Sequence, residues 1–198
     1  MSYNFFAYIS RMRYIERWSL MRNSLPENIQ EHSHMVAVIA HALGIIRRDV
    51  FGAVCNPDEC AAVALYHDCS EILTGDLPTP IKYYNPEIRN AYQEVERVAN
   101  ERLLQNLPEE IRESFRPVLG GEAEKRLHDI VKAADKLSAY LKCIEERRAG
   151  NDEFLSAEKQ IRETLESSGM PEVKYFLDNF IPAFELTLDE LGTIETTK

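Results

Sequence analysis

Four residues in three otherwise apolar segments of this sequence carry side chains that bind divalent metal ions. They are His32, the adjacent pair His67 and Asp68, and Asp135. Burying an imidazole or a carboxylate in an apolar helix is unfavourable unless a partner compensates its polarity. Each residue alone is more typical of a hydrogen-bonded core histidine or a solvated aspartate. Together, two neutral imidazoles and two carboxylates form a mixed nitrogen and oxygen site that suits Mn, Co, Fe or Zn.

The segment LYHDCSEILTGDLPTP, residues 65–80, adds further polar groups beside the His-Asp pair. Glu71 follows His67 by four residues, so a continuous helix would place both on one face. A carboxylate in that position can direct an attacking water molecule. The prolines after Gly75 restrict the backbone. This stretch is either a stiff loop that holds Asp76 against a sugar hydroxyl or only a tight turn.

Arg17 and Trp18 form a second pair with possible roles in substrate binding. A guanidinium group stays charged and can bind two phosphate oxygens in a fork. The indole of Trp18, the only tryptophan, can form an apolar wall against a sugar or a base. The alternative interpretation is a surface arginine beside a core tryptophan, and the residues by themselves leave both interpretations open.

The composition narrows the classes of protein that fit. A length of 198 residues suits one domain, residues 1–198. The net charge of −10 argues against nonspecific binding of nucleic acid, which depends on Lys and Arg. No apolar run approaches the roughly 18 residues of a membrane span, and the start shows no signal-peptide pattern. The four cysteines form no C-x-x-C pair, which favours reduced thiols and a cytoplasmic location.

Helical patterns cover most of the chain. Apolar residues recur at helical spacing over residues 31–47. Asn-Pro pairs predict helix starts at residues 56–57, for a helix reaching about residue 73, and at residues 85–86. Further helices are expected over residues 108–115, 122–149, 152–167 and 171–191, the last kinked at Pro182. With no alternating strand pattern, the sequence predicts a compact all-α domain of about seven or eight helices. The charged run at residues 146–148 is expected to be solvated surface.

The order His32, His67-Asp68, Asp135 resembles the H…HD…D signature of HD-domain metal-dependent phosphohydrolases. The surrounding segments look like those of the YfbR-like 5'-deoxynucleotidases: RWSLMRN, ENIQEHSHMVAVIAHAL, ALYHDCSEILTGDLPTPIKYYN and ADKLSAYLKCIEE…AGN. The likeness covers almost the full chain. It is densest over residues 17–84 and thins after Gly150.

This resemblance implies an all-helical HD-domain fold and a homodimer that hydrolyses deoxyribonucleoside 5'-monophosphates. It implies a divalent ion, cobalt, manganese or another transition metal, held by His32, His67, Asp68 and Asp135. It also implies Glu71 and Arg17 as catalytic residues. The implied substrate-contacting residues are Arg17, Trp18, His32, Asp68, Asp76, Leu77, Pro78, Thr79 and Asp135.

Two rival functions stay open. The first is another HD phosphohydrolase, acting on a phosphodiester or a nucleoside triphosphate. A longer polyphosphate would need more positive charge, and the motif segments contain few Lys or Arg residues. The second is an inactive helical module that only binds nucleotides or a partner. Retention of all four metal-binding side chains argues against that second possibility.

Overall fold

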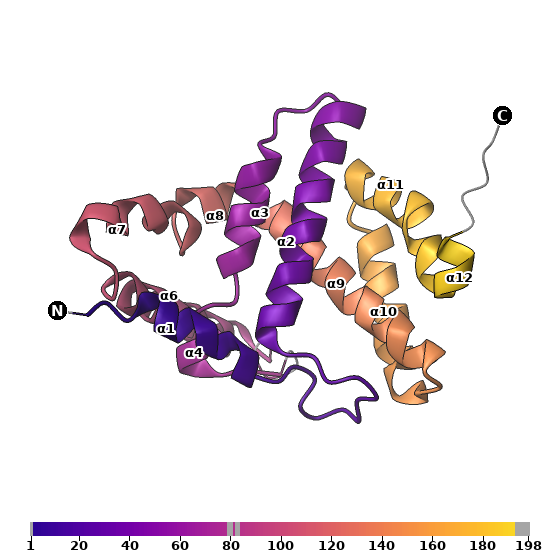
Figure 1. Cartoon of the computed structure of the whole chain (residues 1–198), viewed down its shortest axis with the longest axis horizontal. Coiled ribbons are helices and arrows are strands. Elements are labelled where there is room, and N and C mark those ends of the chain that lie inside the picture. The colour runs from indigo at the N-terminus through magenta and orange to yellow at the C-terminus, as the bar shows by residue number, and fades with distance from the viewer. Residues whose placement is uncertain (1, 79–80, 82–83, 193–198) are drawn as a thin grey trace.

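The computed structural model describes residues 2–78, 81 and 84–192, and these form an assembly of helices (Figure 1). The longer helices are α2 (Ile29–Ile45), α3 (Pro57–Tyr66), α6 (Pro86–Leu104), α9 (His128–Arg148), α10 (Leu155–Glu166) and α11 (Pro171–Asn179). The short helices are α1 (Phe5–Ile9), α4 (Glu71–Thr74), α7 (Glu109–Phe115), α8 (Glu122–Arg126) and α12 (Leu188–Leu191). Among the described residues, the only strand-like pairing is an isolated antiparallel bridge between Glu16 and Asn28. The all-α prediction is therefore confirmed.

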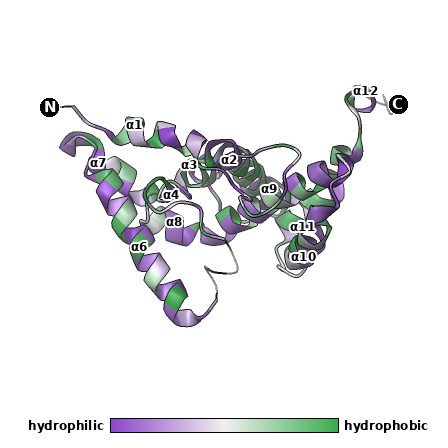
Figure 2. Ribbon diagram, turned by 90° about the horizontal axis from the view of Figure 1, so that it is seen from below, coloured by the Kyte–Doolittle hydropathy of each residue, from purple (hydrophilic) through white to green (hydrophobic). Residues whose placement is uncertain are grey.

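Helices α2, α3 and α9 occupy the centre of the molecule, with α6 and α7 on one side and α10 and α11 on the other (Figure 2). Their buried residues form two apolar clusters. The first joins α2, α3 and α9 to α10 and α11, and the second joins α1 to the end of α6 and the start of α2. Within the described residues, no helix is long and apolar enough to cross a membrane.

The predicted metal-binding residues lie where the two apolar clusters meet. On α2, Ile29 belongs to the second cluster and Val36 to the first, and His32 lies between them. On α3, Ala64 belongs to the first cluster, and Cys69 in the turn after α3 belongs to the second. These polar residues therefore lie at the boundary between the two apolar clusters. A polar site at this boundary does not disrupt the packing within either cluster.

Helix α2 begins at Ile29, two residues before the segment 31–47 that the sequence predicted to be helical. The Asn28 side chain accepts hydrogen bonds from the backbone N–H groups of Gln30 and Glu31, at 3.0 Å each. The Glu31 side chain accepts from the backbone N–H of Asn28, which completes a capping box. Because this cap fixes the helix start, it also sets which face of α2 turns His32 into the interior, where it is fully buried.

The helix predicted to run from residue 57 to about residue 73 ends at Tyr66, and a turn separates it from α4. The His67 imidazole explains the break. Its Nδ1 lies 2.7 Å from the carbonyl oxygen of Ala64. In a continuing helix, that oxygen would accept from the N–H of Asp68. The prediction that Glu71 and His67 share one helix face is therefore wrong, because they belong to different elements.

Three other predicted helices also differ from the structure. The segment 122–149 divides at Leu127, whose buried side chain packs in the first apolar cluster. The segment 171–191 divides into α11, a 3-10 helix at Ile181–Glu185 that contains Pro182, and α12. The segment 152–167 starts with a 3-10 turn at Asp152–Phe154 before α10. The N-terminal α1, followed by a 3-10 helix at Ser10–Tyr14, was not predicted.

A hairpin-like segment, residues 15–29, connects the N-terminal helices to α2 and carries Arg17 and Trp18. Its two ends pair through the Glu16–Asn28 bridge. Its tip is held by Glu146 of α9, whose carboxylate accepts from the backbone N–H groups of Ser24 and Leu25. Glu146 is fully buried, so the prediction that residues 146–148 are solvated surface is wrong for this residue.

The Glu146 carboxylate is also bonded to two side chains. Lys142 donates to it from one turn earlier on α9, and Asn151 donates at 2.8 Å. Burial opposes the charged form, but the hydrogen bonds from Lys142, Asn151 and the hairpin backbone outweigh it and lower the pKa of Glu146 to about 2. The charged form is therefore the one that stabilises the folded protein.

We expect this carboxylate to make folding stability depend on pH. Because the folded-state pKa of about 2 lies below the usual 4.5, the stabilisation is present above about pH 4.5 and is lost as pH falls towards 2. The shift corresponds to about 3 kcal/mol. Urea unfolding across this range should show that E146Q is less stable than wild type at neutral pH and loses less stability on acidification. Equal losses in both proteins would contradict this role.

Candidate active site

His32 is held in one orientation by a residue of α9. Its Nδ1 lies 3.2 Å from the Oγ of Ser138, which is itself buried. Its Nε2 faces the opposite way and lies 3.1 Å from the Oδ1 of Asp135, also on α9. The α2–α9 packing therefore brings together two predicted ligands that are about a hundred residues apart in the chain.

His67 and Asp68 reach the same point from the turn after α3. The His67 and His32 rings lie 5.5 Å apart between centroids. The Oδ2 of Asp68 lies 3.1 Å from the Nε2 of His67 and 3.6 Å from the Nε2 of His32. The structure thus gathers all four residues that were predicted to bind metal.

The donor set fits a metal ion. His32, His67 and Asp135 offer ligand atoms within 4.8 Å of one another, and Asp68 adjoins this group. The Nε2 atoms of both histidines are buried, and their contacts with the Asp135 and Asp68 carboxylates at 3.1 Å lack hydrogen-bond geometry. Each Nδ1 has an oxygen partner, as in metal-bound histidines, where the second ring nitrogen donates to a neighbouring group and leaves Nε2 to coordinate.

The electrostatics of the cluster also favour a cation. Burial acts to lower the pKa of His67, but the negative charges of Asp68 and Asp135 outweigh it and raise that pKa to about 9. Burial acts to raise the pKa of Asp135, but contact with His32 holds it at about 2. The pKa of Asp68 is likewise lowered, against its burial, by His67, His32 and Arg17. Both carboxylates therefore stay charged at neutral pH, whereas His67 carries a proton that it must release before its Nε2 can bind a metal.

Arg17 lies directly beside this cluster. Its Nη1 is 3.7 Å from the Oδ2 of Asp68, and its Nε donates to the Oε2 of Glu27 at 3.1 Å. Burial acts to lower the pKa of Arg17, but the charges of Asp135, Asp68, Glu27 and Asp76 raise it. The guanidinium group is thus surrounded by carboxylates and stays charged beside the predicted metal-binding cluster.

Glu71 follows the turn that carries His67 and Asp68, and its backbone N–H donates to the carbonyl oxygen of Asp68 at 3.0 Å. Glu71 begins α4, and its side chain is only 5% exposed. Gly75 ends that helix with a φ of 75°, as the sequence predicts, and turns the chain into the loop. Asp76, Leu77 and Pro78 are half-buried there, and the charge of Asp76 acts on Arg17. Thr79, also predicted to contact substrate, lies outside the described residues.

Two supporting residues were missed by the sequence interpretation. Ser138 contacts His32, and Glu27 contacts both Arg17 and Trp18. Ser138 follows Asp135 by three residues on α9, a spacing that puts both on one helix face and could have indicated it. Nothing in the local sequence of Glu27 indicates its partners.

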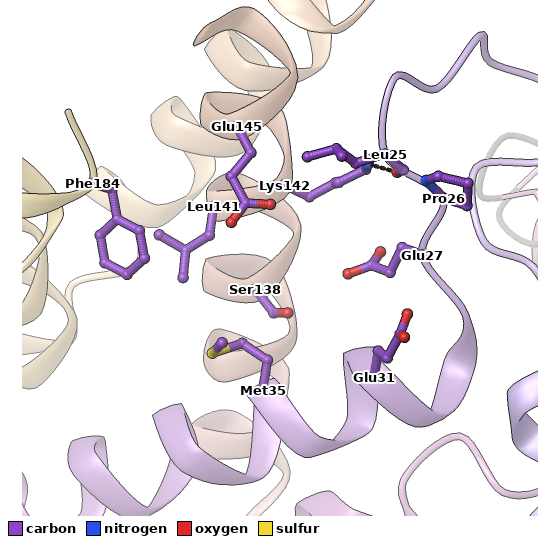
Figure 3. A pocket seen from close by; sticks show the side chains of 10 residues that line it. All are labelled: Leu25, Pro26, Glu27, Glu31, Met35, Ser138, Leu141, Lys142, Glu145 and Phe184. Carbon is purple, nitrogen blue, oxygen red and sulfur yellow. Dashed lines mark hydrogen bonds between the residues drawn. The ribbon is translucent and has the colours of Figure 1, made fainter. Parts of the chain in front are cut away.

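A pocket of about 200 Å³ adjoins these supporting residues (Figure 3). Glu27, Glu31 and Ser138 line it together with Leu141 and Glu145. None of the predicted metal ligands lines the pocket. It therefore lies beside the metal-binding cluster, on the side of its supporting residues.

Comparison with known proteins agrees with this site. A family model described as 5'-deoxynucleotidase YfbR-like matches residues 4–184. The chain belongs to this YfbR-like family. A 5'-deoxynucleotidase of Vibrio parahaemolyticus is 51% identical over 190 residues, covering 96% of this chain and 98% of the relative. The 5'-deoxynucleotidase YfbR of Shigella boydii is 48% identical and covers 96% of each chain. The family resemblance inferred from the sequence is confirmed.

Solved structures place this YfbR-like protein among the HD-domain folds. The crystal structure of an HD-domain phosphohydrolase from Listeria innocua matches with a TM-score of 0.78 and 27% identity, covering 91% of this chain and 88% of the other. The cyanophage S-2L HD phosphohydrolase DatZ, bound to dA and one catalytic Zn²⁺ ion, matches with a TM-score of 0.56 and 20% identity, covering 90% and 93%. The second likeness supports the fold.

Proposed function

We propose that this protein is a metal-dependent 5'-deoxynucleotidase, which hydrolyses deoxyribonucleoside 5'-monophosphates to a deoxynucleoside and inorganic phosphate. The observation that carries this proposal is the convergence of His32, His67, Asp68 and Asp135 beside the cationic side chain of Arg17. The curated relatives of the family, about half identical over nearly the full chain, are 5'-deoxynucleotidases.

The proposed roles follow from chemistry and position. His32, His67, Asp68 and Asp135 hold a divalent ion, which when bound polarises a phosphate oxygen and acidifies water. Arg17 binds phosphate oxygens and balances their charge. The Glu71 carboxylate takes a proton from the attacking water as the new P–O bond forms. The bond from phosphorus to the 5'-oxygen breaks, and the proton becomes available to that leaving oxygen.

A phosphate-release screen tests this function. We would remove metal by chelation, then assay nucleoside mono-, di- and triphosphates, ribo and deoxy, with Mg, Mn, Co or Zn added back. We expect release from deoxynucleoside 5'-monophosphates with Mn or Co, since the mixed nitrogen and oxygen donors suit such ions. Preferential cleavage of triphosphates would favour another HD phosphohydrolase. Absence of turnover with every ion would favour a binding module.

The same proposal also predicts a preference for deoxyribonucleotides over ribonucleotides. We expect dAMP to be cleaved better than AMP, because Trp18 packs where the 2'-hydroxyl of ribose would project. An apolar wall rejects an added hydroxyl by on the order of 10²-fold. Trp18→Ala should therefore narrow the gap in kcat/KM between dAMP and AMP, chiefly by improving AMP relative to dAMP.

Asp76→Ala provides the matched comparison. Asp76 is proposed to accept a hydrogen bond from the 3'-hydroxyl, which both sugars carry, so this variant should weaken both substrates alike. If wild type cleaves AMP as well as dAMP, the deoxy assignment is wrong. If Trp18→Ala leaves a measured preference intact, Trp18 is not its source.

We also propose that residues 1–198 form one domain, and that the protein is a cytoplasmic homodimer. All four cysteines are unpaired, in keeping with a reducing compartment. Phe6, Tyr14 and Leu20 expose more than half of their surface, which is apolar area that a second copy could cover. Sedimentation of the purified protein as a monomer would contradict the dimer.

A further inference from the structure

Trp18 has an unusual backbone conformation. Its φ is 57°, the only positive value among the described residues other than glycine. A bulky side chain in this region is rare, and such strain persists where surrounding contacts enforce it. Two contacts act on its carbonyl oxygen, which accepts from the N–H of Met21 at 2.8 Å and from the side-chain amide of Asn23 at 3.2 Å. These contacts therefore hold the backbone of Trp18 in a strained conformation.

The opposite side of the hairpin supplies the partner. The backbone N–H of Arg17 donates to the carbonyl oxygen of Glu27 at 2.9 Å, next to the Glu16–Asn28 bridge. This pairing sets Glu27 across from Arg17 and Trp18. Because the hairpin tip is separately bonded to Glu146, the register of this pairing is fixed from both ends.

One oxygen of Glu27 serves both side chains. Its Oε2 accepts from the Nε of Arg17 at 3.1 Å and from the Nε1 of Trp18 at 3.0 Å. The Arg17 and Glu27 side chains are only 13% and 15% exposed, so water competes little for these bonds. Since Glu27 engages Nε, the Nη1 of Arg17 is left directed at Asp68, the side on which a metal-bound phosphate would lie.

We infer that Glu27 is a positioning residue that holds Arg17 and Trp18 through a single carboxylate oxygen, and thereby couples phosphate binding to sugar selectivity. The inference rests on the proposed deoxynucleotidase function. Without Glu27, Arg17 would be drawn towards Asp68 and Asp135, whose charges already act on it. Trp18 would lose the hydrogen bond that orients its indole. Both substrate contacts would therefore change together.

The test compares E27Q and E27A with a control of the same charge change. Glu145 lines the same pocket as Glu27 (Figure 3) and is exposed. It makes no hydrogen bond or ion pair to Arg17 or Trp18, so E145Q is that control. For each protein, bound metal, thermal midpoint, kcat and KM are measured for dAMP and AMP. Because Trp18 is the only tryptophan, its emission spectrum reports its surroundings directly in the substrate-free protein.

We expect E27A to keep its metal and to lose kcat/KM for dAMP on the order of 10- to 100-fold, the range for a hydrogen bond to a charged group. KM should rise, because Arg17 would no longer be held in place to bind phosphate, and the dAMP preference should narrow, as in Trp18→Ala. E27Q, which keeps the shape and an acceptor oxygen, should lose less. Trp18 emission should change in E27A, whereas E145Q should match wild type throughout.

Several outcomes would overturn the inference. Unchanged Trp18 emission in E27A would show that Glu27 does not orient the indole. If E27A has wild-type kinetics, Glu27 does not position either side chain. If E27A changes only KM or only the sugar preference, the contacts of Arg17 and Trp18 with substrate are not coupled. If wild type proves not to prefer deoxynucleotides, the proposed specificity fails, but Trp18 emission and the KM of E27A still decide the role of Glu27.

Discussion

Replacing Asp135 by alanine is expected to remove the bound metal and nearly all phosphatase activity. Asp135 contacts His32 at 3.1 Å and belongs to the group of side chains whose ligand atoms lie within 4.8 Å of one another. Changes in residues that merely support a metal ligand typically reduce metal affinity or activity by about 10- to 100-fold. Loss of a direct ligand should have at least that effect. Metal content by mass spectrometry and phosphate release from dAMP measure both consequences.

Asp129 offers a matched control on the same helix. It lies in the first turn of α9, is about half exposed, and pairs with Arg47, away from the cluster. Asp129→Ala should retain metal and turnover, since such exposed ion pairs contribute little to stability. Full metal occupancy with normal turnover in Asp135→Ala would remove Asp135 from the site. It would also leave the H…HD…D interpretation without its last member.

Glu71→Ala is expected to separate chemistry from binding. A general base typically contributes about 10²- to 10⁴-fold, so kcat should fall by that factor while metal content and KM change little. Glu71→Gln, which keeps the size but cannot take the proton, should behave in the same way. Steady-state kinetics with dAMP and metal analysis of the same samples provide the measurement.

The opposite pattern would assign Glu71 differently. If Glu71→Ala loses its metal, the residue belongs to the metal's ligands or their immediate support. If Glu71→Gln retains wild-type kcat, proton transfer to this carboxylate is not part of the rate-limiting chemistry. Because Glu71 is buried in α4, thermal unfolding of both variants should be compared with wild type, so that a folding defect is recognised as such.

The residue types that form the candidate metal site could be identified from the local sequence. Histidine and aspartate within apolar helical segments pointed to a shared metal, because buried polar side chains need partners. Asn28 and Asn56, which cap α2 and α3 in the structure, act through contacts within a few residues. The all-α class follows from the helical spacing of apolar residues along the chain, and the family from the resemblance of its motif segments. These features depend on neighbours in sequence, which local patterns record.

Other features depended on which distant segments pack together. The turn at His67 breaks a helical pattern because its imidazole takes the Ala64 carbonyl, an arrangement suited to a ring that faces His32 across the helix interface. The sequence indicates that Glu146 is a surface charge, but in the structure the tip of the hairpin covers its carboxylate and donates hydrogen bonds to it. A charged side chain is buried when another segment packs over it, and only the tertiary structure brings such distant segments together.

The sequence by itself indicated which side chains could bind metal, phosphate and sugar, and that most of the chain is helical. Only the tertiary structure decided how they are held. Glu27 contacts Arg17 and Trp18 because the hairpin folds back on itself, and Ser138 reaches His32 because α2 and α9 pack side by side. Hydrogen bonds act over about 3 Å. A pattern of residue types cannot specify such distances between segments that meet only after the chain has folded.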